Sequence, residues 1–147
     1  MKNEMILSFR ASLENEPFAR TCLASFIASL NPTIDEIVEM KTIVGEAVSN
    51  AIIHGYNCDS EQTVIMKAMI HDRTVMVQIE DRGQGIENIE EAKQPMFTSK
   101  KELEHAGMGL SIIEALCDKM EIISYLGLGT QLIMIKEFHH DQDRNDS

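Results

Sequence analysis

Apolar residues recur along the chain with two periods, and each period predicts a different kind of element. Alternating apolar and polar residues are typical of strands, whereas apolar residues three and four positions apart are typical of helices. The first pattern predicts strands at 5–9, 63–70, 74–80, 121–126 and 131–136. The second predicts helices at about 14–30, 33–54 and 109–120, with a short helix near 87–93.

The order of these elements predicts an α/β fold of the α+β type. We expect a two-layer sandwich in which helices cover one face of a mixed, mostly antiparallel sheet. With 147 residues, of which 44% are apolar, the chain has the size of one domain with a substantial core. We expect that domain to span 1–138. Residues 139–147 are all polar or charged, and we expect them to form a disordered tail.

The first predicted helix has an unusual polar side, because no charged residue occurs from Thr21 to Asn31. Its polar positions carry only small side chains such as Ser25 and Ser29. A side of this kind is often covered, either by another subunit or partner, or by neighbouring elements of the same core. The sequence leaves both alternatives open.

The net charge of the chain limits the classes of function that we expect. Thirteen Lys and Arg residues face 24 Asp and Glu residues, which gives a net charge of −11. Phosphate backbones are bound by clustered Lys and Arg, so direct binding to nucleic acid is not expected. The sequence contains no apolar run as long as a membrane span and no secretory signal, so we expect a cytoplasmic protein without membrane contact. The isolated Cys22, Cys58 and Cys117 fit reduced thiols.

One candidate site begins where a predicted strand ends, at Asp81-Arg82-Gly83-Gln84-Gly85. A buried carboxylate accepts hydrogen bonds, and the amino group of adenine is a suitable donor. Glycines would let a base approach the backbone, because they lack a Cβ atom. Taken alone, the same pattern also fits an ordinary turn.

Two further patterns add phosphate chemistry. The segment 107–110 leads into a predicted helix, and free N–H groups at a glycine-rich helix N-terminus suit phosphate. Glu46 and Asn50 lie one turn apart on the second predicted helix, so their side chains share a face. The Asn50 amide oxygen is a suitable Mg²⁺ ligand, and the Glu46 carboxylate can accept a proton from a hydroxyl group.

Five segments together resemble the motifs of the GHKL nucleotide-binding family. They are 46–55, 81–85, 95–100, 107–110 and 129–130. This family includes gyrase-type ATPases and histidine kinases, and within it the chain is most similar to the stand-alone anti-sigma serine kinases, above all to the sporulation anti-sigma F group. The resemblance extends from Met1 to about Phe138. It implies the GHKL, or Bergerat, sandwich with ATP and Mg²⁺ as cofactors.

The resemblance implies a role for individual positions. Glu46 is the implied base or orienting group for a serine hydroxyl, Asn50 the implied Mg²⁺ ligand, and Asp81 the acceptor for the adenine amino group. The other implied nucleotide-binding residues are Gly83, Gly85, Thr98, Ser99, Gly107, Met108, Gly109 and Thr130. Arg20 matches a position that family members use to dock partners.

The resemblance also implies a function. Such proteins form homodimers, bind and inhibit an RNA polymerase sigma factor, and phosphorylate a serine of an anti-anti-sigma protein. An alternative is a nucleotide-gated sigma-binding module without phosphoryl transfer. Histidine kinases and gyrase-type machines are less expected, since the sequence shows neither a His-bearing helical hairpin nor a transducer domain. The chain departs from the family pattern at His105, where these kinases commonly carry Arg, so the contacts of that position stay open.

Overall fold

The structure is a computed structural model that describes residues 1–94 and 109–139. Within these ranges, five strands form one sheet in the order β1-β2-β3-β5-β4. The strands are β1 (Lys2–Arg10), β2 (Thr63–His71), β3 (Thr74–Asp81), β4 (Lys119–Tyr125) and β5 (Gly129–Glu137). All four pairings are antiparallel, so the described sheet is antiparallel throughout, whereas the sequence predicted a mixed, mostly antiparallel one.

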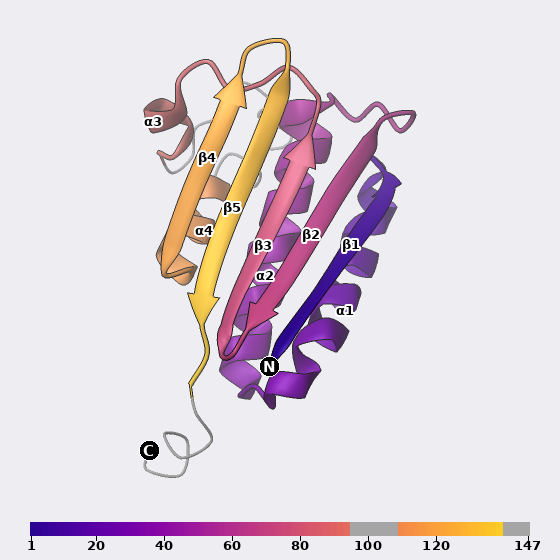
Figure 1. Ribbon diagram of the computed structural model, residues 1–147. Coiled ribbons are helices and arrows are strands. Elements are labelled where there is room, and N and C mark those ends of the chain that lie inside the picture. Colours follow the sequence, from indigo (N-terminus) through magenta and orange to yellow (C-terminus); the bar gives the residue numbers. More distant parts are fainter. Residues whose placement is uncertain (95–108, 140–147) are drawn as a thin grey trace.

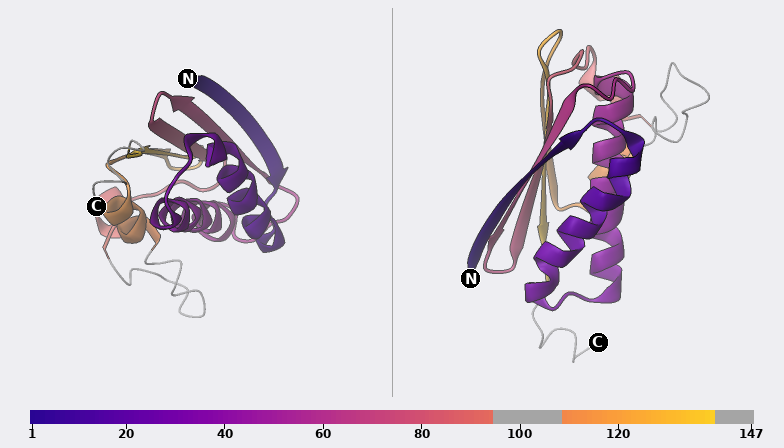
Figure 2. Two further views of the ribbon diagram at one scale, coloured as in Figure 1. Left: turned by 90° about the horizontal axis from the view of Figure 1, so that it is seen from below. Right: turned by 90° about the vertical axis from the view of Figure 1, so that its right-hand side faces the viewer.

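The helices form a single layer against one face of this sheet. They are α1 (Glu16–Ile27), α2 (Ile34–Asn50), the short α3 (Ile89–Ala92) and α4 (Gly109–Leu116). Figure 1 shows α1, α2 and α4 behind the strands, and the side view in Figure 2 shows helices and sheet as two layers. The predicted two-layer sandwich is therefore confirmed.

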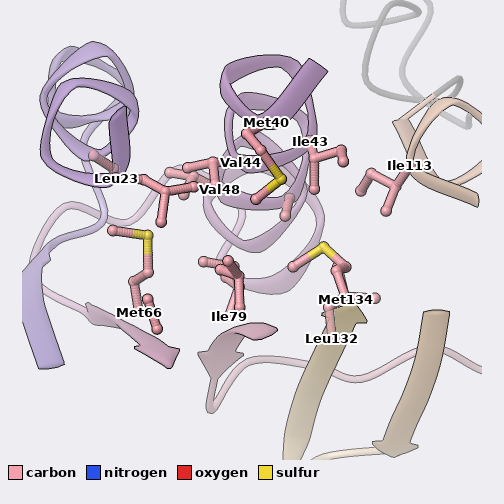
Figure 3. Close-up of a cluster of buried hydrophobic side chains, with 14 of the residues drawn as sticks. Leu23, Met40, Ile43, Val44, Val48, Met66, Ile79, Ile113, Leu132 and Met134 are labelled. Atoms are coloured by element: carbon pink, nitrogen blue, oxygen red, sulfur yellow. The ribbon is translucent and has the colours of Figure 1, made fainter. Parts of the chain in front are cut away.

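The core lies between the two layers, because each element turns its apolar positions inward. In β2 and β3 buried residues alternate with more exposed ones, as expected for strands with one covered face. The helices meet these strands through long aliphatic and Met side chains (Figure 3). The central side chains, all at most 3% exposed, are Leu23, Met40, Ile43, Val44, Val48, Met66, Ile79, Ile113, Leu132 and Met134.

The buried and exposed positions of α1 answer one question that the sequence left open. Leu23, Ile27 and Leu30 are buried, which places one side of the uncharged segment in the core. Ser25 and Ser29, on the other side, are exposed. The uncharged polar side therefore faces away from the chain's own core, and the structure does not support its coverage by neighbouring elements.

Two predicted helix ends differ from the structure. α4 ends at Leu116 and not at Met120, because Lys119 and Met120 already pair with β5 as part of β4. The α-helical part of α2 ends at Asn50, and a π-helical turn, Ala51–Gly55, continues it. Both differences arise because tertiary pairing and packing override the local apolar period.

The C-terminal end of the described chain is attached to the start of α2. The backbone N–H of His139 donates to Glu36 Oε2 at 2.9 Å, and Phe138 is buried. Of the tail predicted to be disordered, 139–147, the structure describes only His139, which forms this hydrogen bond, and 140–147 lie outside the described residues. None of the helices within 1–94 and 109–139 is long and apolar enough to cross a lipid bilayer.

Candidate functional site

A cavity of about 700 Å³ lies at one end of the helix–sheet interface. Its volume falls within the roughly 300–1,000 Å³ that is usual for cofactor and ligand sites. Its wall consists of Ala47, Asn50, Ala51, His54, Gly55, Ile79, Asp81, Gln84, Gly85, Ile86, Glu87, Asn88, Glu91, Ala92, Leu110, Leu126, Thr130 and Leu132. The predicted Asn50, Asp81, Gly85 and Thr130 thus share one cavity, although they come from three separate parts of the chain.

Asp81 is the buried carboxylate of this cavity. It is the last residue of β3, is 7% exposed, and pairs with Thr130 of β5. Its Oδ1 accepts the Gly83 N–H at 2.9 Å. Burial raises the pKa of Asp81 to about 6, although hydrogen bonds from the backbone of Gly83 and Thr130 oppose the shift. At neutral pH the side chain is thus mainly ionised and can accept further hydrogen bonds.

Two glycines determine the position of the Asp81 carboxylate. A Cβ atom on Gly55 would lie 2.7 Å from Asp81 Cγ, so only glycine leaves room for the acid. A Cβ on Gly83 would collide with the Gly55 carbonyl oxygen. Gly83 therefore packs against the π-helical turn and is absent from the cavity wall, whereas Gly85, with φ +79°, lines the cavity. Of these two glycines, Gly85 is part of the cavity wall and Gly83 is not, and their contact with a base stays a prediction.

The π-helical turn contributes three residues to the wall, Ala51, His54 and Gly55. Its wider hydrogen-bond spacing shows in the bond from Tyr56 N–H to the Ala51 carbonyl, at 3.0 Å. The turn is fixed to the loop after β3 by Gln84, whose N–H donates to the Gly55 carbonyl at 2.9 Å and whose Nε2 donates to the His54 carbonyl at 2.5 Å. Such single-turn widenings of helices often occur at functional sites.

Glu46 and Asn50 meet the start of α4 at Gly109. A Cβ on Gly109 would lie 3.1 Å from Glu46 Oε2 and 3.6 Å from Asn50 Oδ1. The glycine thus brings the first turn of α4, with its partial positive charge, close to both side chains. Asn50 lines the cavity, and Glu46 lies beside it without being part of the wall. These three predicted residues come together as expected from the sequence.

The remaining predicted residues lie elsewhere. Thr98, Ser99, Gly107 and Met108, together with His105, lie outside the described residues. Arg20 is on α1, where its Nε forms an ion pair with Glu16 Oε1 at 2.7 Å. This pair packs over Gly45 of α2 and does not contribute to the cavity wall. A partner-docking role for Arg20 stays a prediction.

Comparison with known proteins connects this geometry to a family. Residues 9–136 match the family described as the histidine kinase-like ATPase domain. Among curated proteins, the anti-sigma F factor of Clostridium perfringens strain SM101 is 49% identical over 95% of this chain and 99% of its own length. The anti-sigma F factor of Anoxybacillus flavithermus is 51% identical over 92% and 93%. The chain belongs to the histidine kinase-like ATPase family and, within it, to the anti-sigma F factors.

Solved structures show the same fold for this family. The RsbU and RsbW domains of a Mycobacterium tuberculosis protein match 92% of the chain with a TM-score of 0.67 and 22% identity, and the match spans 32% of that longer chain. The catalytic domain of the histidine kinase ThkA matches 91% of the chain and 96% of its own, with a TM-score of 0.57 and 19% identity. The family match over residues 9–136 confirms the predicted resemblance to the GHKL family, and the solved structures show the same fold.

Several residues of the site were not recognised in the sequence. Gly55 stands where a glycine commonly ends a helix, yet the left-handed conformation that ends helices belongs to Asn57 and Cys58, with φ of 57° and 63°. Tyr56 accepts the Arg82 N–H at 2.6 Å and donates to the Thr63 carbonyl at 2.7 Å, which fixes the loop after Asp81. Ser124 contacts Thr130 from β4. These roles depend on pairings between distant segments, so no local pattern could reveal them.

Proposed function

We propose that this anti-sigma F family member is an ATP- and Mg²⁺-dependent protein serine kinase that binds and inhibits a sporulation sigma factor. The observation that carries the proposal is the single cavity with an acceptor site around Asp81 and a second polar cluster around Asn50. Asp81 lies against Gly55. Gly55 follows Asn50 by more than one turn of the helix formed by α2 and the π-helical turn. This spacing suits a ligand with a base at one end and phosphates at the other.

The base end fits adenine by its hydrogen-bonding chemistry. Asp81 can only accept when ionised, and the adenine amino group can donate to it. Thr130 lines the cavity and pairs with Asp81, and Gly85 presents backbone without a Cβ. Ile79, Leu132 and Leu110 supply the apolar surface that a flat base needs.

The phosphate end fits Mg²⁺ and a hydroxyl nucleophile. The Asn50 amide oxygen is a neutral oxygen ligand next to the helix N-terminus at Gly109, and no all-protein cluster of metal-binding acids or histidines occurs in the described ranges. This agrees with an ion that is held mainly by phosphates and waters, as Mg²⁺ commonly is. When bound, Mg²⁺ neutralises phosphate charge. Glu46 would then orient the attacking serine hydroxyl and accept its proton.

The partners in this proposal are a sigma factor, an anti-anti-sigma protein that carries the target serine, and a second copy of the chain. Relatives of about 50% identity over nearly the whole chain are named anti-sigma F factors, which supports the sigma factor. The uncharged exposed side of α1, with Ser25 and Ser29, supports a covered protein surface, and Arg20 lies on the same helix. Light scattering should give the mass of a dimer, and a monomer at micromolar concentration would contradict that part.

The deciding experiment is transfer of label from γ-³²P ATP to the purified cognate anti-anti-sigma protein. The wild-type chain should label one serine. Glu46→Gln should reduce the labelling rate by about 100-fold or more, because a proton acceptor at the reacting group contributes about 10²–10⁴. The same variant should bind ADP within about threefold of wild type, since Glu46 does not line the cavity. Glu121→Gln on the exposed strand β4 is the matched control and should label normally.

The outcomes separate the kinase from a purely nucleotide-gated binding module. A wild-type chain that binds ATP and the sigma factor but never labels the partner would favour the binding module. Normal labelling by Glu46→Gln would remove Glu46 from the catalytic role while leaving the kinase in place.

A further inference from the structure

The hydroxyl of Ser124 connects two parts of the cavity wall without being part of it. Ser124 lies on β4 directly opposite Thr130 of β5. Its Oγ accepts the Ile86 N–H at 2.8 Å and lies 2.7 Å from Thr130 Oγ1 and 3.2 Å from the Gly129 carbonyl oxygen. Ile86 and Thr130 both line the cavity, whereas Ser124 does not.

The small number of hydroxyl protons in this cluster limits the hydrogen bonds that it can form. A serine hydroxyl has one proton and two lone pairs. The Ile86 N–H can only donate to Ser124 Oγ, and the Gly129 carbonyl can only accept from it. If Ser124 donates to Gly129, the Thr130 hydroxyl must donate to Ser124 and has only lone pairs left for a ligand in the cavity that Thr130 lines. If Ser124 donates to Thr130 instead, the Thr130 proton is free for a ligand. The direction of the Ser124 proton thus decides whether Thr130 offers a ligand an acceptor or a donor.

The same cluster holds the loop after Asp81 in place. Beside the Ile86–Ser124 bond, the Gly127 N–H donates to the Gln84 carbonyl at 2.8 Å. Gly85 lies so close to the Tyr125 carbonyl that a Cβ would overlap it. The loop with Gly85 and Ile86 and the hydroxyl of Thr130 are therefore positioned by one hairpin, β4–β5, and Ser124 is the side chain that binds to both.

We propose that Ser124 is a positioning residue for recognition of the purine base. By directing the Thr130 hydroxyl and fixing the Gly85–Ile86 backbone, it makes the base end of the cavity selective for adenine over hypoxanthine. This inference rests on the proposed nucleotide site. It concerns base discrimination, so Ser124 should contribute little to the phosphoryl-transfer step itself.

The test compares equilibrium binding of ADP and inosine diphosphate, at constant Mg²⁺, to wild type, Ser124→Ala and Ser124→Thr. Ser124→Ala should weaken ADP binding by about 5–30-fold, the usual effect of losing one or two neutral hydrogen bonds. It should also reduce the ratio of ADP to inosine diphosphate affinity, because the Thr130 hydroxyl is no longer directed. Ser124→Thr keeps the hydroxyl and should restore both affinity and ratio. Ser8→Ala, on the exposed edge strand β1, is the matched control and should change neither.

A kinetic readout adds a second criterion. With the partner protein as substrate, Ser124→Ala should raise KM for ATP by a similar factor and leave kcat within about twofold of wild type, because the phosphate end is untouched. Equal loss of both nucleotides with an unchanged ratio would show general weakening of the hairpin and overturn the inference. Wild-type affinity and ratio in Ser124→Ala would also overturn it. A wild-type chain that binds neither nucleotide would overturn the nucleotide site and this inference with it.

Discussion

Asp81 is a carboxylate held where few water molecules can reach it, and this costs the ligand-free fold free energy. Because its folded pKa, about 6, lies above the ordinary value of 3.8, the folded state binds the proton more tightly than the unfolded chain. The side chain therefore destabilises the fold progressively as pH rises from about 4 through 6, and the full cost is present at neutral pH. A ligand amino group that donates to the carboxylate would recover part of that cost.

Asp81→Asn should separate stability from binding. At pH 7.5 the ligand-free variant should gain about 1–3 kcal/mol in the free energy of unfolding, since each pKa unit corresponds to about 1.4 kcal/mol. The gain should diminish toward pH 4, where the wild-type acid is protonated. ADP affinity should fall by about 10–100-fold, the effect of losing a hydrogen bond to a charged group.

Urea unfolding and calorimetric titration at pH 5, 6 and 7.5 measure both effects. Wild-type ADP affinity should decrease below pH 6, whereas that of Asp81→Asn should not follow this pH dependence. Glu80→Gln, the neighbouring acid on the opposite face of β3, should bind ADP normally. An Asp81→Asn variant with wild-type ADP affinity would contradict the base assignment.

At the scale of elements, the π-helical turn Ala51–Gly55 decides the shape of the base end. It brings Gly55 against Asp81, and Gln84 then bonds to two of its carbonyl groups. In a regular α-helix each hydrogen bond would span one residue fewer. The residues after Asn50 would then be rotated about the helix axis and would contact other parts of the chain. The local sequence 51–55 has no Pro or other signal that demands this geometry.

Gly55→Ala tests this element. The added Cβ would lie 2.7 Å from Asp81 Cγ, so either the turn or the carboxylate must move. We expect a loss of about 1–3 kcal/mol of stability, as is usual for overpacking, and at least a tenfold loss of ADP affinity in calorimetric titration. Gly45→Ala is the control: its new Cβ would lie 2.5 Å from Glu16 Oε1, and Gly45 is not part of the cavity wall. It should also lose stability by overpacking, by about 1–3 kcal/mol, but keep ADP affinity within about threefold. Equal ADP binding by both variants would contradict the role of the turn.

At the scale of the whole molecule, Glu36 connects the beginning of the helix layer to the end of the chain. It forms a capping box with Thr33, and its other oxygen accepts the His139 N–H, 103 positions away. Burial alone would raise the pKa of Glu36, but the hydrogen bonds from Thr33 and His139 outweigh it and lower the pKa. The charged form is therefore the one that stabilises the fold.

Glu36→Gln should destabilise the protein by about 1–2 kcal/mol at pH 7, because an amide offers only one acceptor to these two backbone donors. Since the folded pKa is lowered, the contribution of the wild-type acid is complete above about 4.5 and is lost as pH falls through the folded value. Urea unfolding at pH 7 and pH 4 should therefore show a smaller difference between variant and wild type at the lower pH. Asp35→Asn, an exposed acid of the same first turn, should cost less than about 0.5 kcal/mol. Equal costs for the two variants would contradict the proposed connection.

The sequence by itself determined the layers of this protein and the residue types of its site. Apolar periods located the five strands and three main helices, because one covered face repeats every second residue in a strand and about every 3.6 residues in a helix. Three motifs also indicated the family: Asp81 with its glycines, Glu46 with Asn50, and the segment 107–110. Each motif has chemistry that does not depend on its neighbours. Those inferences needed only short-range pattern and functional-group chemistry.

Tertiary structure alone decided how the parts of the site meet. The pairing of β1 with β2 and of β3 with β5, the end of α4 at Leu116 and the π-helical turn follow from contacts between segments separated in the chain. The exclusion of Gly83 from the cavity wall and the role of Ser124 have the same origin, because each depends on which backbone lies across from it. A single sequence specifies which groups are available, and only packing in three dimensions determines which of them come within hydrogen-bonding distance.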